Sequence, residues 1–323
     1  MWTQAQVVAA FVTGIVSLTI ALWNYFSGRK TQIEIEILKN KHTSEQSEND
    51  ARRSYEFDAR KRLYEEYEPL LFQLMEASDN AIHRVQSLAR TAKHGNLNDD
   101  GWLSDFNYYP KSTIYKLLVP IALYRIMQKK LTLVDITVDK SIGLRYNLAK
   151  MLYISYTDDF EFARLYRNIE YDPNHDSWLN LRKENPVKYW RQGLPMGLLD
   201  KTVDLLIEKE NNEKERIISY GEFEKKIFNQ NAPDINLSRD IFFNFHPQKR
   251  PVLWRILIAQ SIILRTLIEL KDYKPEQINN FLVKSLLLQQ TNIEEFQWTT
   301  DPEILKEVQE PFLVAIEYFT KRF

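Results

Sequence analysis

One stretch near the beginning of the chain, residues 7–26, restricts the possible folds more than any other feature. It has no charged side chain over 20 consecutive residues, whereas charge is frequent in the rest of the chain. As an α-helix it would be about 30 Å long, which matches the hydrocarbon thickness of a bilayer. Its strong apolar residues favour insertion by roughly −3 to −5 kcal/mol before Thr13, Ser17 and Thr19 subtract from the total. The stretch therefore predicts a transmembrane anchor over residues 1–28.

The flanks of this stretch predict its orientation. Trp2 lies near one end, and Trp23 and Tyr25 lie near the other, where amphipathic rings prefer the headgroup region. Arg29 and Lys30 follow the stretch, so the positive-inside rule places the preceding residues outside and the rest of the chain in the cytoplasm. A signal peptide would carry its positive charge before the apolar run, so we expect an uncleaved single-pass anchor. A buried N-terminal helix is the alternative.

Small and polar residues recur within the apolar stretch at alternating spacings of four and three. Such a seam lets the backbones of two membrane helices approach closely, and its serine or asparagine could add an interhelical hydrogen bond. The seam predicts self-association in the membrane, although small residues are also common in anchors that remain single. Its members are Ala10, Gly14, Ser17, Ala21 and Asn24.

Residues 29–54 separate the apolar stretch from the remainder of the chain. No strong apolar residue occurs between Lys39 and Asp50, so a sustained coiled coil, which needs apolar a and d positions, is not supported. We expect either a polar helical stalk or a flexible tether.

Basic residues in and after this segment could contact phosphate groups or anionic lipid headgroups. Interleaved acidic residues largely neutralise them, so a solvated helix with salt bridges is the alternative. The net charge of −1 for the whole chain argues against nucleic acid as a partner. The candidate residues are Arg29, Lys30, Arg52, Arg53, Arg60 and Arg62.

The remainder of the chain predicts an all-α body. Only 8 glycines occur, where average usage would give about 23, and this scarcity argues against doubly wound nucleotide-binding folds. Helical apolar spacing predicts one helical domain over residues 55–166 and a second over residues 198–323. Prolines and glycines interrupt residues 167–197, which we interpret as an irregular connector.

Several local features carry their own expectations. Gly95 is expected to end a long helix as its C-cap, and residues 131–139 are expected to form a short strand or an extended turn. Residues 198–209 are expected to be helical. Arg255 and Arg265 would each cost about 2.5 to 3.5 kcal/mol near a bilayer centre, so the apolar helix that contains them is expected in the core.

The sequence contains no recognisable catalytic or metal-binding motif. The five histidines are not at metal-binding spacings, and neither phosphate-binding glycine loops nor nucleophile elbows of the common kinds occur. We therefore predict no metal and no cofactor, and the sequence identifies no catalytic residue. An enzyme site assembled from distant segments stays open as an alternative, with Asp158, Asp159, Arg167, Asp172 and His175 as the candidates.

Five segments together resemble a known family. They are "ALWNYFSGRKTQIEIEILK", "DARRSYEFDARKRLYEEYEPLLFQLMEASDNAIHRVQSLART", "GWLS", "STIYKLLVPIALYRIMQKKLTLVD" and "YWRQGLP", within residues 20–200. They are similar to a largely uncharacterised family of bacterial proteins with one N-terminal anchor and a helical cytoplasmic region. The resemblance implies the bacterial inner membrane, but it implies no activity and no catalytic residue.

These observations favour a membrane-anchored helical scaffold or effector over an enzyme. It would oligomerise or recruit a cytoplasmic protein partner, and a role in bacterial defence against phage would suit such a module. Two alternatives remain open. One is a membrane-tethered nuclease or hydrolase, and the other is a regulatory module that binds nucleic acid or nucleotide through the Arg52–Arg62 region.

Overall fold

The computed structural model of the chain is mostly helical, as the sequence predicts. It describes residues 3–98, 100–104, 107–132, 134–157, 192–209, 215–228, 233–270 and 293–302. The chain divides into two compact units, Met1–Lys61 and Arg62–Phe323. The following elements make up the described part: α1 (Gln4–Lys93), α2 (Tyr108–Leu131), η1 (Ile136–Val138), α3 (Lys140–Thr157), α7 (Met196–Asp204), β1 (Ile207–Lys209), β2 (Glu215–Ile217), α8 (Tyr220–Phe223), the π-helix η2 (Glu224–Phe228), α9 (Pro233–Phe242), α10 (Pro251–Glu269) and η4 (Glu294–Phe296).

The first unit consists of the first part of α1. Its described residues are helical from Gln4 onwards, and all of their side chains except those of Glu56 and Ala59 are exposed. The polar segment between Lys39 and Asp50 is part of this helix. This segment is therefore helical in the structure, and its role as a stalk stays a prediction.

In the second unit, the last turns of α1 pack antiparallel to α2. Arg84 in α1 donates a hydrogen bond of 3.0 Å to Ser112 in α2, and Lys130 forms a 2.6 Å ion pair with Glu66. As the residue number rises along α2, its partner in α1 falls. Apolar side chains from both helices are buried between these polar contacts.

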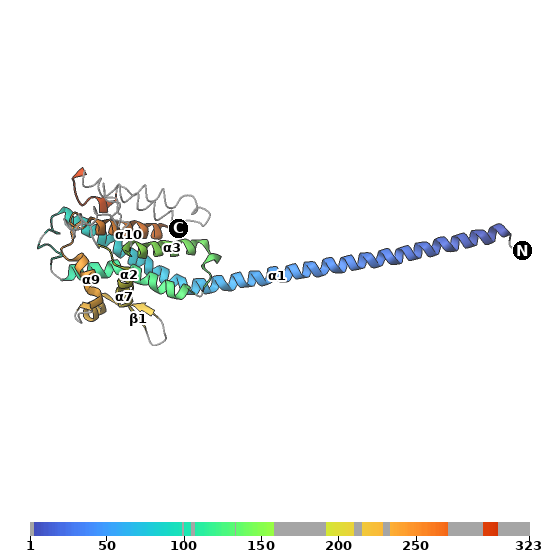
Figure 1. Ribbon diagram of the computed structural model, residues 1–323, viewed down its shortest axis with the longest axis horizontal. Helices are drawn as coiled ribbons and strands as arrows, with labels where there is room; N and C mark the ends of the chain where they lie inside the picture. Colours follow the sequence, from blue (N-terminus) through green and yellow to red (C-terminus); the bar gives the residue numbers. More distant parts are fainter. Residues whose placement is uncertain are drawn as a thin grey trace, which may run out of the picture. The chain divides into compact units, whose positions relative to one another are not determined.

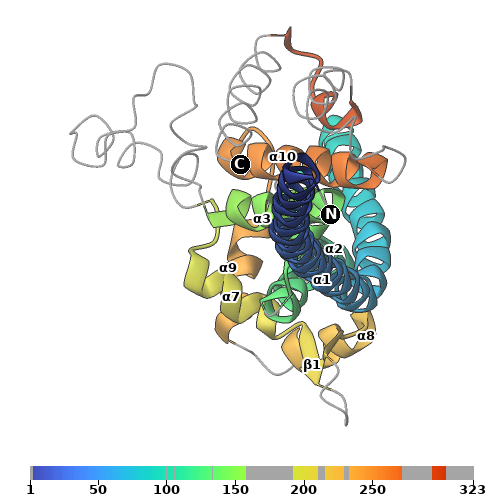
Figure 2. The same ribbon diagram turned by 90° about the vertical axis from the view of Figure 1, so that its right-hand side faces the viewer.

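Helix α10 lies in the core of this unit, beside α3 (Figures 1 and 2). Gln260 of α10 is fully buried, accepts a 2.7 Å hydrogen bond from Tyr156 of α3, and donates one of 2.8 Å to the Leu117 carbonyl of α2. Because an unpaired buried amide would cost about 1–3 kcal/mol, these bonds specify how the three helices meet. Helix α3 comes from the first predicted domain, residues 55–166, and α10 comes from the second, residues 198–323. Both helices belong to the one unit described here, and the division of the body into two domains stays a prediction.

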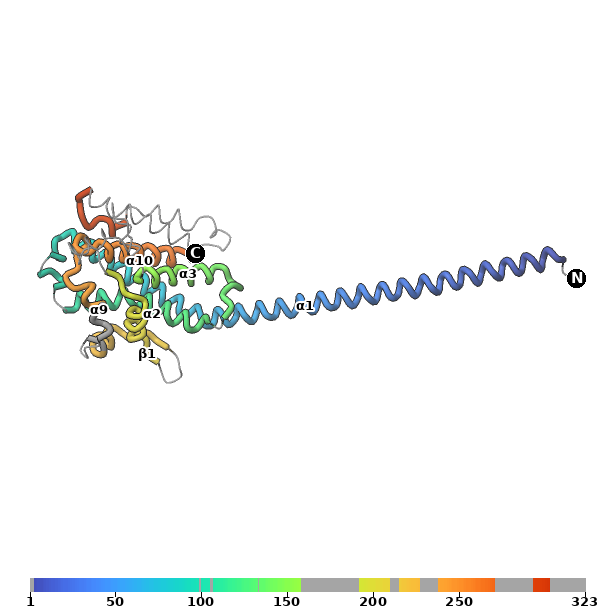
Figure 3. The backbone as a smooth tube through the Cα atoms, viewed as in Figure 1, coloured from blue at the N-terminus to red at the C-terminus, as the bar shows by residue number. Residues whose placement is uncertain are grey.

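The turn between α2 and α3, which Figure 3 traces, differs from the short strand or extended turn that the sequence predicts. Residues 136–138 form a 3₁₀-helix, and Asp135 accepts a 2.9 Å hydrogen bond from the Thr137 amide. Asp139 accepts bonds from the Ser141 and Ile142 amides, so it acts as the N-cap of α3. Short polar side chains that satisfy the first amides of a helix outweigh the β-propensity of this segment.

Asp139 also joins this turn to α1. Its other carboxylate oxygen accepts a 2.8 Å hydrogen bond from the Tyr64 hydroxyl. Burial alone would raise the pKa of Asp139, but the hydrogen bonds from Ser141, Tyr64 and Ile142 outweigh burial and lower the pKa below its usual value.

Two further local expectations have different outcomes. Gly95 has a positive φ of 75°, and the Asn96 amide donates back to the Thr91 carbonyl at 3.0 Å, so the predicted C-cap of α1 is confirmed. The helix expected over residues 198–209 ends at Asp204 instead, and residues 207–209 form β1. The strand β1 pairs antiparallel with β2, with Glu208 opposite Arg216.

Candidate functional site

The apolar stretch of α1 is exposed along its whole length. The exposed fractions of its large apolar side chains run from 50% at Leu22 and Val16 to 73% at Trp23. A water-soluble helix normally buries such side chains against a core. The stretch is therefore the first candidate functional feature of the molecule.

A comparison with α10 shows how unusual this exposure is. Among the described residues, α1 and α10 are long and apolar enough to cross a membrane by length and composition. In α10, 89% of the apolar window is buried in the protein, whereas in α1 the figure is 0%. The prediction that α10 is a core helix is confirmed. Its Arg255 is fully buried, and its Arg265 pairs with Glu295.

The two threonine hydroxyl groups in the exposed stretch form hydrogen bonds within the helix. Thr13 donates a 2.8 Å hydrogen bond to the Ala9 carbonyl, and Thr19 donates one of 2.8 Å to the Ile15 carbonyl. Such bonds reduce the cost of placing a hydroxyl in an apolar environment. The polar residues within the stretch therefore oppose its transfer into lipid less than their composition implies.

The seam residues share one face of the uninterrupted α1 helix, because spacings of four and three return to nearly the same angle. All five are exposed, and a Cβ atom built on Gly14 meets no atom within 4 Å. This face is therefore open to a second helix. The residues are Ala10, Gly14, Ser17, Ala21 and Asn24.

The six basic residues predicted to contact phosphate or lipid all lie on α1, but on several sides of it. Arg29 lies 6.0 Å from the centre of the Tyr25 ring, next to Lys30 at the end of the apolar stretch. Arg52 forms a 3.2 Å ion pair with Glu56. At 100° per residue, Arg53 and Arg60 share a side, whereas Arg52 and Arg62 lie on other sides. The four arginines of residues 52–62 thus do not form one continuous patch.

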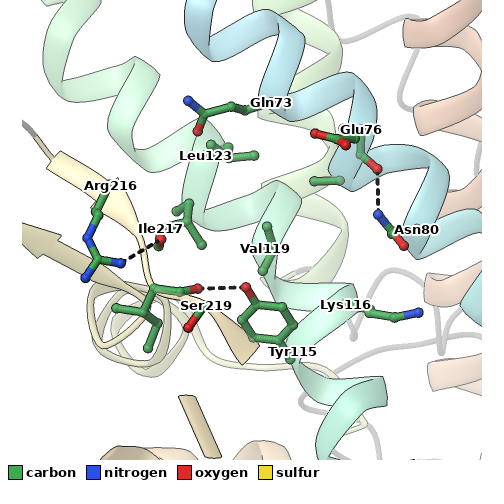
Figure 4. Close-up of a pocket in the computed structure, with 12 residues that line it drawn as sticks. Gln73, Glu76, Asn80, Tyr115, Lys116, Val119, Leu123, Arg216, Ile217 and Ser219 are labelled. Atoms are coloured by element: carbon green, nitrogen blue, oxygen red, sulfur yellow. Dashed lines mark hydrogen bonds between the residues drawn. The ribbon is translucent and has the colours of Figure 1, made fainter. Parts of the chain in front are cut away.

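A cleft in the second unit is a further candidate, and sequence analysis did not identify it. It has a volume of about 360 Å³ and lies between α1, α2 and the chain from β2 into α8 (Figure 4). Apolar side chains form much of its surface, and amide and charged side chains stand around it. The lining residues that matter below are Gln73, Glu76, Ala77, Asn80, Lys116, Val119, Leu123 and Arg216.

Local contacts hold the β2 side of the cleft in place. The Tyr115 hydroxyl of α2 donates a 2.7 Å hydrogen bond to the Ile218 carbonyl. Ser219 and Glu222 form a capping box at the start of α8. Hydrogen bonds from Arg216 and Ser219 hold the pKa of Glu222 well below its usual range. This side of the cleft is therefore fastened to α2 and ordered by its own caps.

The predicted dispersed enzyme site lies outside the described residues. This applies to Asp158, Asp159, Arg167, Asp172 and His175. In the part of the chain that the structure describes, no group of three or more His, Asp or Glu side chains could hold a metal ion.

Comparisons with known proteins identify no relative of this chain. No protein-family model, curated protein or solved structure matches this chain. The resemblance to bacterial single-pass proteins, and with it the bacterial origin and the role in defence, stays a prediction.

Proposed function

We propose that the protein is a single-pass membrane protein that residues 7–26 anchor in the bilayer. The observation that carries this proposal is the exposure of the apolar window of α1, of which 0% is buried, beside the 89% burial of the comparable window in α10. Both windows are apolar, but among the described residues only the window of α10 is packed against protein. Lipid would provide the missing apolar environment for α1, with a gain of roughly −3 to −5 kcal/mol.

Charge and aromatic residues at the end of the stretch support one orientation. Arg29 and Lys30 follow it directly, and Trp23 and Tyr25 lie where they would reach the headgroup region. The residues before the stretch would then lie outside the cell membrane, and the helical body would lie in the cytoplasm. Arg29 and Lys30 would contact the anionic headgroups of the cytoplasmic leaflet.

In the proposed mechanism, the protein acts by holding its helical body at the membrane surface. The anchor confines the helical body to the membrane surface, where tethering raises the effective concentration of its binding sites for each other or for a cytoplasmic partner. The helical body would act as a scaffold that recruits such a protein.

Removal of the anchor tests this proposal. A chain that begins at Thr31 is expected to remain in the supernatant after ultracentrifugation and to keep a helical circular-dichroism spectrum. The intact chain should stay in the membrane pellet after extraction with alkaline carbonate. Joining an unrelated transmembrane helix to the shortened chain should return it to the pellet. A shortened chain that cannot fold, together with an intact chain that is soluble, would identify α1 as part of the core.

The seam predicts association between copies in the membrane. Replacement of Gly14 and Ala21 by leucine should abolish oligomers in mild detergent, because the larger side chains keep the backbones apart. Light scattering of the purified protein in detergent measures the mass of the oligomer. Gly14 has no neighbour within 4 Å in the single chain, so loss of oligomers would report contact between chains.

A matched control uses the other side of the same helix. The pair Val12→Leu and Val16→Leu adds leucines there and should leave the oligomer unchanged. Oligomers that survive both pairs of substitutions would rule out this seam as the contact.

A further inference from the structure

The cleft of about 360 Å³ between α1, α2 and the chain from β2 into α8 lies outside the proposed membrane anchor. Its size and its side chains are those of a site for a small ligand. Small-molecule sites commonly have volumes of about 300–1,000 Å³ and combine an apolar surface with a few polar groups. Ala77 of α1 and Val119 and Leu123 of α2 supply the apolar part. Gln73 and Asn80 place amide groups beside it (Figure 4).

Lys116 lies at one end of this cleft with its charge uncompensated. It is partly buried and makes no ion pair or hydrogen bond through its amine with any described residue. Burial and the neighbouring Arg84 both lower the pKa of Lys116, because each disfavours its positive charge. The flexible four-carbon stem of a lysine lets its amine adjust to a partner.

Arg84 adds a second positive charge near the same end. Only 7% of it is exposed, and it donates to Ser112 and lies 4.6 Å from the Tyr109 ring centre. Among the described residues, the polar partners of Arg84 are the Ser112 hydroxyl and the Tyr109 ring, and no carboxylate pairs with it. Burying a cation without an acidic partner is costly, so an anion near Arg84 and Lys116 would stabilise both.

The remaining charges determine which end of the cleft an anion would occupy. Arg216 is already held by Glu208 and Glu222. The Glu76 carboxylate makes no ion pair with a described residue and would repel a second negative charge. Figure 4 shows Glu76 and Lys116 extending away from each other. Lys116 therefore provides the most favourable position for a negative group.

We infer that this cleft binds a small organic anion. Its carboxylate or phosphate group would contact Lys116, and its apolar body would lie over Ala77, Val119 and Leu123. A dissolved molecule or a lipid headgroup could present the same phosphate chemistry.

Phenyl phosphate, which has a phosphate group on an apolar ring, is a suitable probe. Isothermal titration of the full-length protein in detergent should show saturable binding that is tighter than that of inorganic phosphate or phenol. Lys116→Met should weaken it at least tenfold, and Lys116→Arg should retain most of it. Lys93→Met, which removes an exposed lysine of α1 outside the cleft, should have no effect. Ala77→Leu should also weaken binding, because it fills the apolar part without changing the charge.

Two results would overturn the inference. One is the absence of saturable binding by the unmodified protein. The other is equal binding by the unmodified protein and Lys116→Met when circular dichroism shows both to be folded.

Native mass spectrometry from phosphatidylglycerol nanodiscs separates the two sources of the anion. Lipid retained by the unmodified protein and lost from Lys116→Met assigns a headgroup, whereas phenyl phosphate binding without retained lipid assigns a dissolved anion.

Discussion

Replacement of Ile15 and Leu18 by arginine is expected to release the protein from the membrane. Both residues lie near the middle of the apolar stretch and are exposed, at 56% and 64%. Each arginine near a bilayer centre costs about 2.5 to 3.5 kcal/mol on the insertion scale. Two of them outweigh the roughly −3 to −5 kcal/mol that favours insertion. After alkaline carbonate extraction, the variant should move from the pellet to the supernatant or be degraded in the cell.

The same two charges placed later in α1 provide the matched control. Thr43→Arg and Ser47→Arg lie in the polar part of the helix, where both residues are exposed. This variant should stay in the pellet like the unmodified protein. If the Ile15 and Leu18 variant stays there too, the stretch is not the anchor.

Replacement of Trp254 by alanine is expected to cause the largest loss of stability in the helical body. Trp254 is fully buried in α10, and its ring lies 6.1 Å from Phe245 and 6.5 Å from Trp298. Its indole N–H has no hydrogen-bond partner among the described residues, so the loss is one of packing. Truncation of a buried tryptophan lowers the free energy of unfolding by about 3–5 kcal/mol. Urea unfolding of the full-length protein in detergent measures the change.

Trp102 offers a control for the same chemical change at the surface. It is 55% exposed, and its ring centre lies 5.3 Å from that of Tyr109 with the two rings nearly perpendicular. Trp102→Ala should therefore cost no more than about 1.5 kcal/mol. Equal losses at the two positions would show that α10 is not the centre of the core.

The features that sequence analysis predicted correctly depend on residues close together in the chain. Gly95 at the end of α1 acts through the local backbone. The burial of α10 followed from Arg255 and Arg265 in an apolar helix, because arginine makes a lipid environment unfavourable. These effects need no knowledge of distant segments.

The features that sequence analysis missed depend on contacts between distant residues. Gln260 gave no signal in the sequence, because its partners Tyr156 and Leu117 are more than 100 residues away. The role of Asp139 as a helix cap is apparent only with the 3₁₀ turn before α3.

The cleft was missed for the same reason. It combines α1, α2 and the residues after β2, and only the folded unit brings Lys116 near Asn80 and Ser219. The S-x-x-E pattern of Ser219 and Glu222 was the one local signal that could have suggested an ordered element there. Local capping predicts where a helix starts, but not which hollow lies beside it.

The proposed position of the chain across the membrane can be tested directly, since the sequence contains no cysteine. Single cysteines at Thr3 and Thr43 lie on either side of the apolar stretch and can be labelled with a membrane-impermeant maleimide in right-side-out vesicles. Our account predicts labelling of position 3 in intact vesicles and of position 43 only after lysis. Equal labelling of both positions in intact vesicles, or protection of both until lysis, would contradict it.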